Sequence, residues 1–424
     1  MRYAFGFLIF VCGSIAVADN FPDVKSQIES RAIKYFIENA HPVTGQVRDR
    51  ADNFTVSAGP NRVASIAATG FGLAVIANGA GRGTVDRSFA HDYVLKTLKF
   101  ASDHVPRRKG WFVHFYDWET GSRVFNSEYS TIDTALFMAG ALYASHVFKD
   151  PQMAALVSGL YENMDFWDAM TDGGTQPLKR TLSMAYTESK SYTSAQWNMY
   201  AEEMILLIMG LGHPRHPLPP ESWGAFSRAL KKIPSSGQEV MGLDQALFVH
   251  QYSQLYLDFR NFSDGYKNYF ENSREVSDYH RELSSSEKKY KTFREGFWGL
   301  SAGETPYGYG ASNALDYQST VCIACAVASA PYSPKAILSD AQNWIDGIYS
   351  PQIWGRYGIT DSLDLDQNWF SPYVLGITVG PEYLALANLD PLTSIWSVFM
   401  EIPEVKNGLA LAAQGINLLQ SSTN

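Results

Sequence analysis

The chain has 424 residues, of which 46% are hydrophobic and 18% are charged. This balance supplies enough apolar side chains for a large buried core and excludes an intrinsically disordered protein. The net charge is −9 and there is no long basic run, so nucleic acid is not an expected partner. Aromatic residues make up 14% of the chain, which fits a bulky core and equally fits a site for flat ligands such as sugar rings.

Residues 1–18 have the pattern of a secretory signal peptide. Arg2 provides a positive charge, residues 3–15 are mostly apolar, and Ala16 and Ala18 supply the small side chains of a cleavage site. The apolar run is too short to cross a bilayer comfortably, and no longer one follows it. We therefore expect cleavage after Ala18 and an exported protein, periplasmic or secreted, with no membrane-inserted segment after cleavage.

The rest of the chain is predicted to be helical, because apolar residues recur at spacings of three and four. Some segments, such as 66–76 and 204–211, are apolar on nearly all sides, whereas others have one polar face. Helices of the first kind need other helices around them. This predicts an all-α fold, an (α/α)6 toroid of inner and outer helices whose long loops form a cleft at one end. The predicted helices lie at 22–40, 63–79, 85–104, 131–148, 151–170, 194–211, 246–258, 264–282, 317–330, 334–347 and 403–419.

Long loops rich in aromatic residues and glycine connect these helices, at 105–130, 171–193 and 296–316. Strand signals are short and scattered, as at 111–116. The polar stretch 283–295 is interpreted as one more loop rather than a linker. Residues 19–424 are therefore expected to form a single domain.

Two cysteines, Cys322 and Cys325, remain in the mature chain. A C-x-x-C pair can bind zinc or carry out redox chemistry, but no second pair exists to complete a four-ligand zinc site. The apolar sequence around them predicts a buried helix in which the two thiols serve as small hydrophobic side chains. A local disulfide is the second interpretation, since an exported protein can form one.

Two short segments place carboxylates beside apolar helices: Glu128 and Asp133 in one, Glu202 and Glu203 in the other. Cleavage of a glycosidic bond needs one carboxylic acid to protonate the leaving oxygen and one carboxylate to activate water or attack carbon. Partial burial would raise the pKa of Glu202 towards that of a general acid. A structural interpretation stands beside each segment, because Ser130 and Asp133 fit a capping box and a glutamate at a helix start can simply be solvated.

Motifs for metals and phosphate are weak. The glycines around Glu304 lack the strand and helix that a phosphate-binding G-x-G-x-x-G loop needs. Asp361 and the aspartates after it lack the glycine and the closing glutamate of a calcium loop. His213 and His216 alternate with prolines, which predicts a turn. We expect no metal and no cofactor.

Several motifs, in chain order, resemble those of the bacterial glycoamylase-like family, from about residue 25 to residue 415. They lie at 64–73, 110–123, 127–136, 202–206, 213–219, 247–253, 257–260, 269–273, 298–300 and 357–361. The resemblance implies an (α/α)6 barrel and endo-β-1,2-glucanase activity or related processing of β-1,2-glucans. The acidic candidates of the family match Asp133 and Glu202 of this chain.

The chain departs from the usual family pattern in three places. Thr378 and Val379 replace Asp and Gln, the segment from Ala387 to Asp390 replaces Glu-Asn-Tyr-Arg, and Glu304 replaces an Asp of the Gly-rich loop. The lost charges favour a competing interpretation, a glycan-binding protein without catalytic activity. A transglycosylase that remodels periplasmic glucans is a third interpretation.

The main hypothesis is an exported inverting glycoside hydrolase, an endo-β-glucanase that cleaves β-1,2-glucan or a related envelope glycan. Catalysis is assigned to Glu202 as the general acid, with Asp133, Glu128 and Asp361 as further carboxylates. The oligo- or polysaccharide is expected to bind to a monomer. Its predicted contacts, each of which could instead support the barrel, are Trp111, His114, Tyr116, Trp197, His250, Gln251, Arg260, Trp298, Glu304 and Tyr307.

Overall fold

Buried and half-buried helices alternate along the chain in the computed structural model, which describes residues 23–55, 61–170, 180–189 and 191–422. The helices buried over almost their whole length are α2 (Ile66–Gly81), α4 (Thr131–Phe148), α7 (Met204–Leu211), α12 (Ile323–Val327) and α15 (Gly376–Ala387). Those with one buried face are α1 (Val24–Glu38), α3 (Arg87–His104), α5 (Pro151–Glu162), α10 (Tyr269–Ser286) and α13 (Pro334–Asp346).

Shorter helices and a long C-terminal helix complete the helical part. They are α6 (Phe166–Ala169), α8 (Glu221–Gly224), the 3-10 turn η2 (Leu247–His250), α9 (Tyr252–Tyr256), α11 (Lys291–Arg294), α14 (Ser350–Ile353), α16 (Ile395–Phe399) and α17 (Pro403–Ser422). Among the described residues, no helix is both long enough and apolar enough to cross a bilayer. The predicted signal peptide, residues 1–18, lies outside the described residues.

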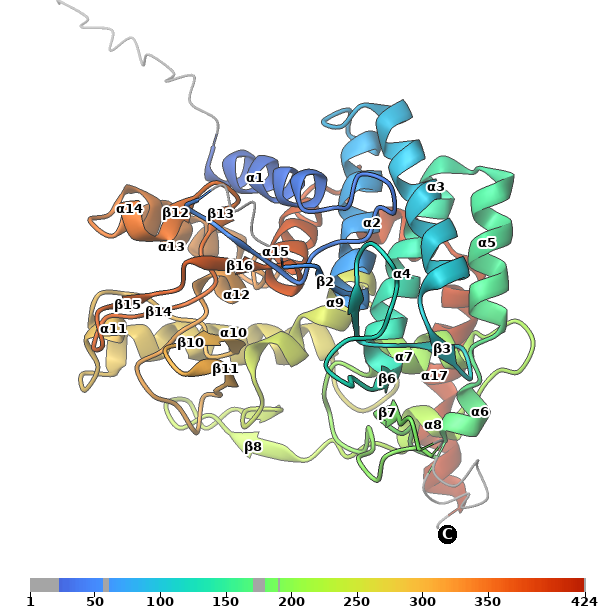
Figure 1. The fold of residues 1–424 in the computed structure, drawn as a ribbon. Helices are drawn as coiled ribbons and strands as arrows, with labels where there is room; N and C mark the ends of the chain where they lie inside the picture. Colours follow the sequence, from blue (N-terminus) through green and yellow to red (C-terminus); the bar gives the residue numbers. More distant parts are fainter. Residues whose placement is uncertain (1–22, 56–60, 171–179, 190, 423–424) are drawn as a thin grey trace, which may run out of the picture.

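Neighbouring buried helices pack directly on one another. α2 contacts α4, α4 contacts α7, α7 contacts α9, and α12 contacts α15, which packs back on α2. Figure 1 shows α2, α3, α4 and α5 side by side on the right, with the strands from β10 onwards on the left. The approach of α2 to α4 requires glycine, because a Cβ on Gly140 would lie 1.9 Å from the carbonyl oxygen of Gly70.

The strands are short and form two-stranded antiparallel sheets in the described part of the chain. β1 (Arg50–Asp52) pairs with β16 (Tyr373–Leu375), so an early and a late segment lie together. The other pairs are β2 (Val63–Ser65) with β5 (Phe115–Asp117), β3 (Arg107–Arg108) with β4 (Trp111–Phe112), β6 (Tyr129–Ser130) with β7 (Ala185–Tyr186), β8 (Leu230–Lys232) with β9 (Glu239–Met241), β10 (Ala302–Thr305) with β11 (Gly308–Ala311), β12 (Trp354–Gly355) with β13 (Gly358–Ile359), and β14 (Leu363–Asp364) with β15 (Trp369–Phe370).

The helix-rich core agrees with the predicted class, but an all-α description omits these hairpins. Two predicted helices are also much shorter than expected. α7 begins only at Met204, because the backbone before it bonds to another loop, as in the 2.8 Å bond from Trp197 N–H to the Leu182 carbonyl. α12 begins only at Ile323, because Val321 exchanges two backbone hydrogen bonds with Leu363.

Other boundaries differ for local reasons. The predicted loop 283–295 contains the end of α10 and all of α11, and the predicted helix 151–170 divides into α5 and α6. The predicted helix 246–258 is a 3-10 turn followed by the short α9. No helix is predicted over α15, whose residues include Gly376, Gly380 and an internal Pro381.

The preferred interpretation of the two cysteines is wrong, because Cys322 and Cys325 form a disulfide. Cys322 caps α12 and Cys325 lies one turn later, which brings their Cα atoms to 5.2 Å, within the range for a disulfide. The cross-link holds the start of α12, where the Cys322 N–H also donates to the Gly299 carbonyl at 2.8 Å.

Candidate active site

Carboxylates gather where the buried helices begin. Asp133 lies in the first turn of α4, where the Ser130 side chain both caps the helix and donates to the Asp133 carboxylate. Glu202 comes directly before α7, and its backbone carbonyl accepts a 2.6 Å hydrogen bond from Ser253 at the start of α9. Asp361 precedes β14 in a loop bonded to α12. Helix starts therefore position two of the four predicted catalytic carboxylates, and the loop before β14 positions a third.

His114 joins two of these carboxylates. Its Nδ1 lies 2.8 Å from Glu128 Oε1, and its Nε2 lies 3.6 Å from Asp133 Oδ1. Burial lowers the pKa of His114, but the charges of Asp133 and Glu128 outweigh it and raise the pKa to about 9. The imidazole is therefore protonated at neutral pH, and its hydrogen bond in turn lowers the pKa of Glu128.

The same three side chains have the chemistry of a cation site. Ligand atoms of His114, Glu128 and Asp133 all lie within 4.8 Å of one another. A metal would need the neutral imidazole, whereas the two carboxylates favour the protonated ring. The positive charge of protonated His114 thus offsets the negative charges of Glu128 and Asp133, as a bound cation would. That catalysis needs no metal stays a prediction.

Glu202 and Glu203 are neighbours with different surroundings. Burial, and then the charge of Asp133, raise the pKa of Glu202 from 4.5 to about 7, and part of this residue remains exposed. Glu203 is fully buried, its carboxylate oxygens have no hydrogen-bond partner among the described residues, and burial raises its pKa to about 8. Of the two, only Glu202 can both hold a proton near neutral pH and meet a ligand.

Asp361 is also fully buried but is held by several donors. Its Oδ2 accepts hydrogen bonds from the Glu304 N–H at 2.7 Å and from the Ser362 hydroxyl at 2.8 Å. Its Oδ1 has no partner in the part of the chain that the structure describes. Burial raises the pKa of Asp361 to about 6 despite these bonds. The Glu304 carboxylate pairs with Arg50, which also lies 3.0 Å from Asp49.

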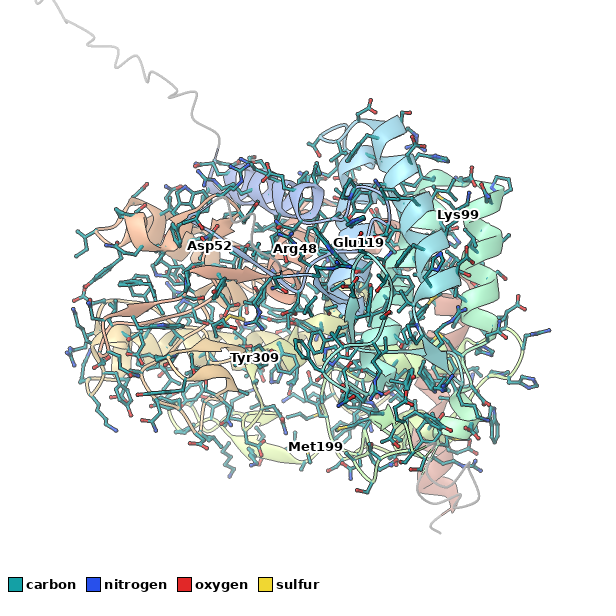
Figure 2. All side chains as sticks on the ribbon, in the orientation of Figure 1. Arg48, Asp52, Lys99, Glu119, Met199 and Tyr309 are labelled. Carbon is teal, nitrogen blue, oxygen red and sulfur yellow. A yellow bond between two sulfur atoms is a disulfide. The ribbon has the colours of Figure 1, made fainter. Side chains whose placement is uncertain are left out.

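Two tyrosines, Tyr252 and Tyr309, lie close enough to this cluster for its charges to affect their hydroxyl groups. Neither is predicted from the sequence. Burial, and then the charges of Asp361, Asp133 and Glu202 among others, raise the pKa of both Tyr252 and Tyr309. Tyr309 exposes 53% of its surface and lies centrally in the molecule (Figure 2). It is paired with Glu304 across the β10–β11 hairpin, so the two side chains share one face.

A strand pattern in the Gly-rich loop would have revealed Tyr309, because residues 304 and 309 face each other in a tight hairpin. We instead predict Tyr307, which the structure places at the exposed tip of the hairpin, 87% exposed and bonded to Gln367 at 2.8 Å. Arg50, the first residue of β1, and Asp49 before it belong to no motif that would mark them in the sequence.

Three predicted aromatic contacts do not reach this site. Trp111, Tyr116 and Trp298 are fully buried and use their polar atoms internally, on Tyr192, Gln46 and Asp340 respectively. They cannot stack on a ligand in this conformation, so the expectation that they form its walls is wrong. Trp197 lies closer, because its Nε1–H donates to Thr131 at the start of α4, yet it exposes only 7% of its surface.

The predicted polar contacts divide in the same way. His250 and Gln251 are buried below the cluster, where His250 lies 3.3 Å from the Tyr200 hydroxyl and Gln251 donates to the Cys325 carbonyl at 2.9 Å. Burial lowers the pKa of His250 to about 4, so it is neutral. Both support the interior rather than contact a substrate.

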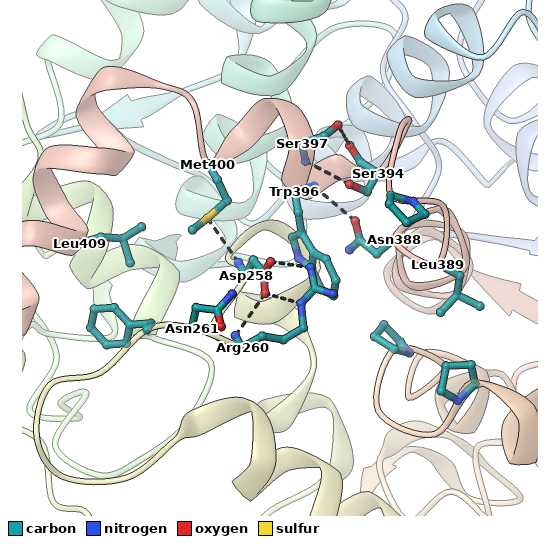
Figure 3. A pocket seen from close by; sticks show the side chains of 14 residues that line it. Asp258, Arg260, Asn261, Asn388, Leu389, Ser394, Trp396, Ser397, Met400 and Leu409 are labelled. Atoms are coloured by element: carbon teal, nitrogen blue, oxygen red, sulfur yellow. Dashed lines mark hydrogen bonds and ion pairs between the residues drawn. The ribbon is translucent and has the colours of Figure 1, made fainter.

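Arg260 lies elsewhere, in a pocket of about 600 Å³ at the C-terminal ends of the buried helices. Figure 3 shows its guanidinium bonded to Asp258 and lying over Trp396, 4.6 Å from the ring centroid. The carboxylate cluster is at the N-terminal ends of those helices. The expectation that Arg260 holds substrate hydroxyls at the cluster is therefore wrong.

The remaining motifs have structural partners. Asp364 accepts from Ser319, Thr320 and Gln367, and His213 accepts the His216 N–H at 3.0 Å in the predicted turn. These contacts account for the acidic loop and for the His-Pro motif without a ligand.

Comparison with known proteins gives a family match over part of the chain and similar proteins over nearly all of it. Residues 194–403 match the family model "Glycoamylase: Putative glucoamylase". An exo-β-1,2-glucooligosaccharide sophorohydrolase (non-reducing end) of Parabacteroides distasonis is 24% identical over 90% of this chain. The chain spans only 56% of that relative's length.

Solved structures agree over nearly the whole chain. An endo-β-1,2-glucanase from Chitinophaga pinensis, in complex with sophorotriose and glucose, is 24% identical with a TM-score of 0.83, covering 92% of this chain and 97% of its own. A β-1,2-glucanase from P. distasonis is 22% identical with a TM-score of 0.82, covering 92% of this chain and 60% of its own. A helix-rich protein with an acidic cluster at its helix starts is thus similar to glycoside hydrolases in fold. Residues 194–403 are thus similar to the glycoamylase family, and the chain as a whole has the fold of the solved β-1,2-glucanases.

Proposed function

We propose that this protein is a glycoside hydrolase that cleaves β-1,2-linked glucan. The observation that carries the proposal is Glu202, a partly exposed carboxyl group with a pKa of about 7 beside the carboxylate of Asp133. Such a pair combines an acid that is protonated near neutral pH with a carboxylate, as hydrolysis of a glycosidic bond requires. The relatives that are named for β-1,2-glucans suggest the linkage.

In the proposed reaction, Glu202 donates its proton to the leaving glycosidic oxygen as the bond to the anomeric carbon breaks. A water on the opposite side attacks that carbon and loses its proton to Asp133, directly or through a substrate hydroxyl, which inverts the configuration. Glu128 and Asp361 add negative charge that stabilises the positive charge developing on the sugar ring. Protonated His114 fixes Asp133 and Glu128 relative to each other.

The proposal includes the architecture and the location of the protein. The order of helix contacts, with α15 packed back on α2, supports a single (α/α)6 toroid over residues 19–424. The Cys322–Cys325 disulfide supports an oxidising compartment and hence export, to the periplasm or to the outside. We propose a monomer that takes an oligo- or polysaccharide and no cofactor.

A panel of linear and cyclic glucans of different linkages tests the function through the release of reducing ends. We expect release from β-1,2-glucan and little from other linkages, and loss of release in Glu202→Gln. Binding without release would instead indicate a glycan-binding protein, which Thr378 in place of the family's Asp favours. New products longer than the substrate would indicate transfer rather than hydrolysis.

A further inference from the structure

A second cavity, of about 410 Å³, lies directly behind the β10–β11 hairpin. Glu304 and Tyr309 are paired with each other and share one side of this hairpin. Side chains alternate between the two faces of a strand, so Gly303 and Gly310, which are paired with each other, belong to the opposite face. Both glycines line the cavity. Asp361 of the cluster also lies on the Gly303 side, because a Cβ on Gly303 would be 2.7 Å from Asp361 Oδ2. The cavity therefore borders the cluster directly.

The lining of the cavity is suited to a sugar. Hydroxyl, amide and carboxylate groups converge on it from the loop after the hairpin and from Gln367, and tyrosine rings border it. Polar groups of both kinds, donors and acceptors, match sugar hydroxyls, and an aromatic ring covers the apolar face of a pyranose. The polar groups from the loop are Ser312, Asp316, Gln318, Ser319 and Thr320.

Tyr307 bridges two walls of this cavity. Its hydroxyl donates to Gln367 Oε1 at 2.8 Å, and both residues line the cavity. With 87% of its surface exposed, the Tyr307 ring still offers a face to a ligand. Among the large aromatic side chains of the described residues, Tyr307 is the most exposed, and Phe125 follows with 75%.

The cavity adjoins the carboxylate cluster. Glu304 borders both, and Ser362, which donates to Asp361, also lines the cavity. A polysaccharide whose scissile bond lies at Glu202 and Asp133 can therefore continue past Glu304 to Tyr307.

We propose that this cavity is a distal subsite that binds further sugar residues of the same glycan chain and so sets the preferred chain length. This inference rests on the proposed function. It assigns recognition of the chain, remote from the bond that is cleaved, to Tyr307 and to the polar side chains that line the cavity: Ser312, Asp316, Gln318, Ser319 and Thr320.

Gly310→Leu is the variant that tests the subsite. Gly310 has no positive φ, and a Cβ there would meet only Thr305 Cγ2, at 3.2 Å. A leucine is therefore tolerated by the backbone, and its side chain fills the cavity. Leu315→Ala is the matched control, because Leu315 lies on the same loop, is 47% exposed and does not line the cavity.

The assay is kcat/KM on linear β-1,2-gluco-oligosaccharides, lengthened by one glucose at a time from the trisaccharide. In the wild type we expect kcat/KM to rise with length and then level off. Gly310→Leu should lower it about tenfold for the long oligosaccharides and less than about twofold for the shortest one cleaved. Leu315→Ala should match the wild type at every length. An equal loss at all lengths, or no loss at any, overturns the subsite.

A binding measurement separates this inference from the proposed function. If the wild type cleaves none of the oligosaccharides, the proposed function fails, and calorimetry with the longest of them decides the subsite. Weaker binding to Gly310→Leu than to the wild type supports the subsite. Equal binding overturns it, and absence of binding to the wild type overturns both.

Discussion

Replacing Glu202 by glutamine should slow the proposed reaction and, at the same time, stabilise the folded protein. Glutamine keeps the shape of the side chain but has no acidic proton to donate to the leaving group. General acid catalysis contributes about 100-fold to 10,000-fold in rate, so we expect kcat to fall at least about 100-fold. The wild-type rate should also fall above about pH 7, where Glu202 loses its proton. The variant should lack that decline.

The effect on stability follows from the same pKa. It rises from 4.5 in the unfolded chain to about 7 in the folded one, so the folded state binds the extra proton between these values. The free energy of unfolding therefore falls as pH rises through this window, by up to about 3 kcal/mol. Because Glu202 is partly exposed, we expect about 1–2 kcal/mol. Glutamine does not titrate, so Glu202→Gln loses no stability over this pH range. The free energy of unfolding of the variant, measured relative to the wild type, should therefore be higher at pH 8 than at pH 4.

The assay combines initial rates on β-1,2-glucan with denaturant unfolding at both pH values. Glu203→Gln is the control, because Glu203 is fully buried and should affect stability in the same direction while leaving turnover within about tenfold of the wild type. Turnover of Glu202→Gln close to that of the wild type would refute the assignment and favour Glu203. An equal stability difference at both pH values would refute the electrostatic argument.

Three further predictions concern the surroundings of the site. Asp133→Asn should reduce turnover by orders of magnitude while the melting temperature stays level or rises. A lower melting temperature with an intact rate would mean that Asp133 has only a structural role, through its hydrogen bond with Ser130 at the start of α4. Exhaustive chelation should change neither activity nor melting temperature, and a loss restored by one divalent cation would point to His114 with Glu128 and Asp133. Cys322→Ser with Cys325→Ser should lower the free energy of unfolding by about 1–2 kcal/mol, since the closed loop is short; unchanged stability in denaturant would contradict this.

Sequence patterns predict the long helices well and the packing details poorly. α2, α3 and α4 end within a few residues of their predicted limits, because their apolar periodicity is continuous. α15 is not predicted, because glycine and proline disfavour a helix. Its glycines are required by contacts that no local pattern contains: a Cβ on Gly380 would lie 2.5 Å from the Phe71 Cβ.

The candidate site divides in a similar way. Asp133 and Glu202 are candidates from the sequence because they are carboxylates at the starts of apolar segments, where partial burial changes their chemistry. Asp361 is reached only through the resemblance, at the end of the motif 357–361. Trp111, Tyr116 and Trp298 are predicted wrongly, because residue type does not tell whether an aromatic ring faces a ligand or the core. Tyr309 is missed because its position depends on the register of a hairpin.

The contact between α15 and the first helices has a consequence for how the chain folds. The Tyr383 hydroxyl of α15 bonds to Asn78 of α2, 305 residues earlier, and β16 pairs with β1. Contacts so distant in the chain are slow to form, because the chain loses the conformational entropy of a long loop before these contacts stabilise the fold. Until α15 arrives, the faces of α1 and α2 that it covers remain open, and apolar surface of this kind makes folding intermediates prone to aggregate. The risk of misassembly is therefore greatest in the nearly complete chain, just before its last buried helix docks on its first.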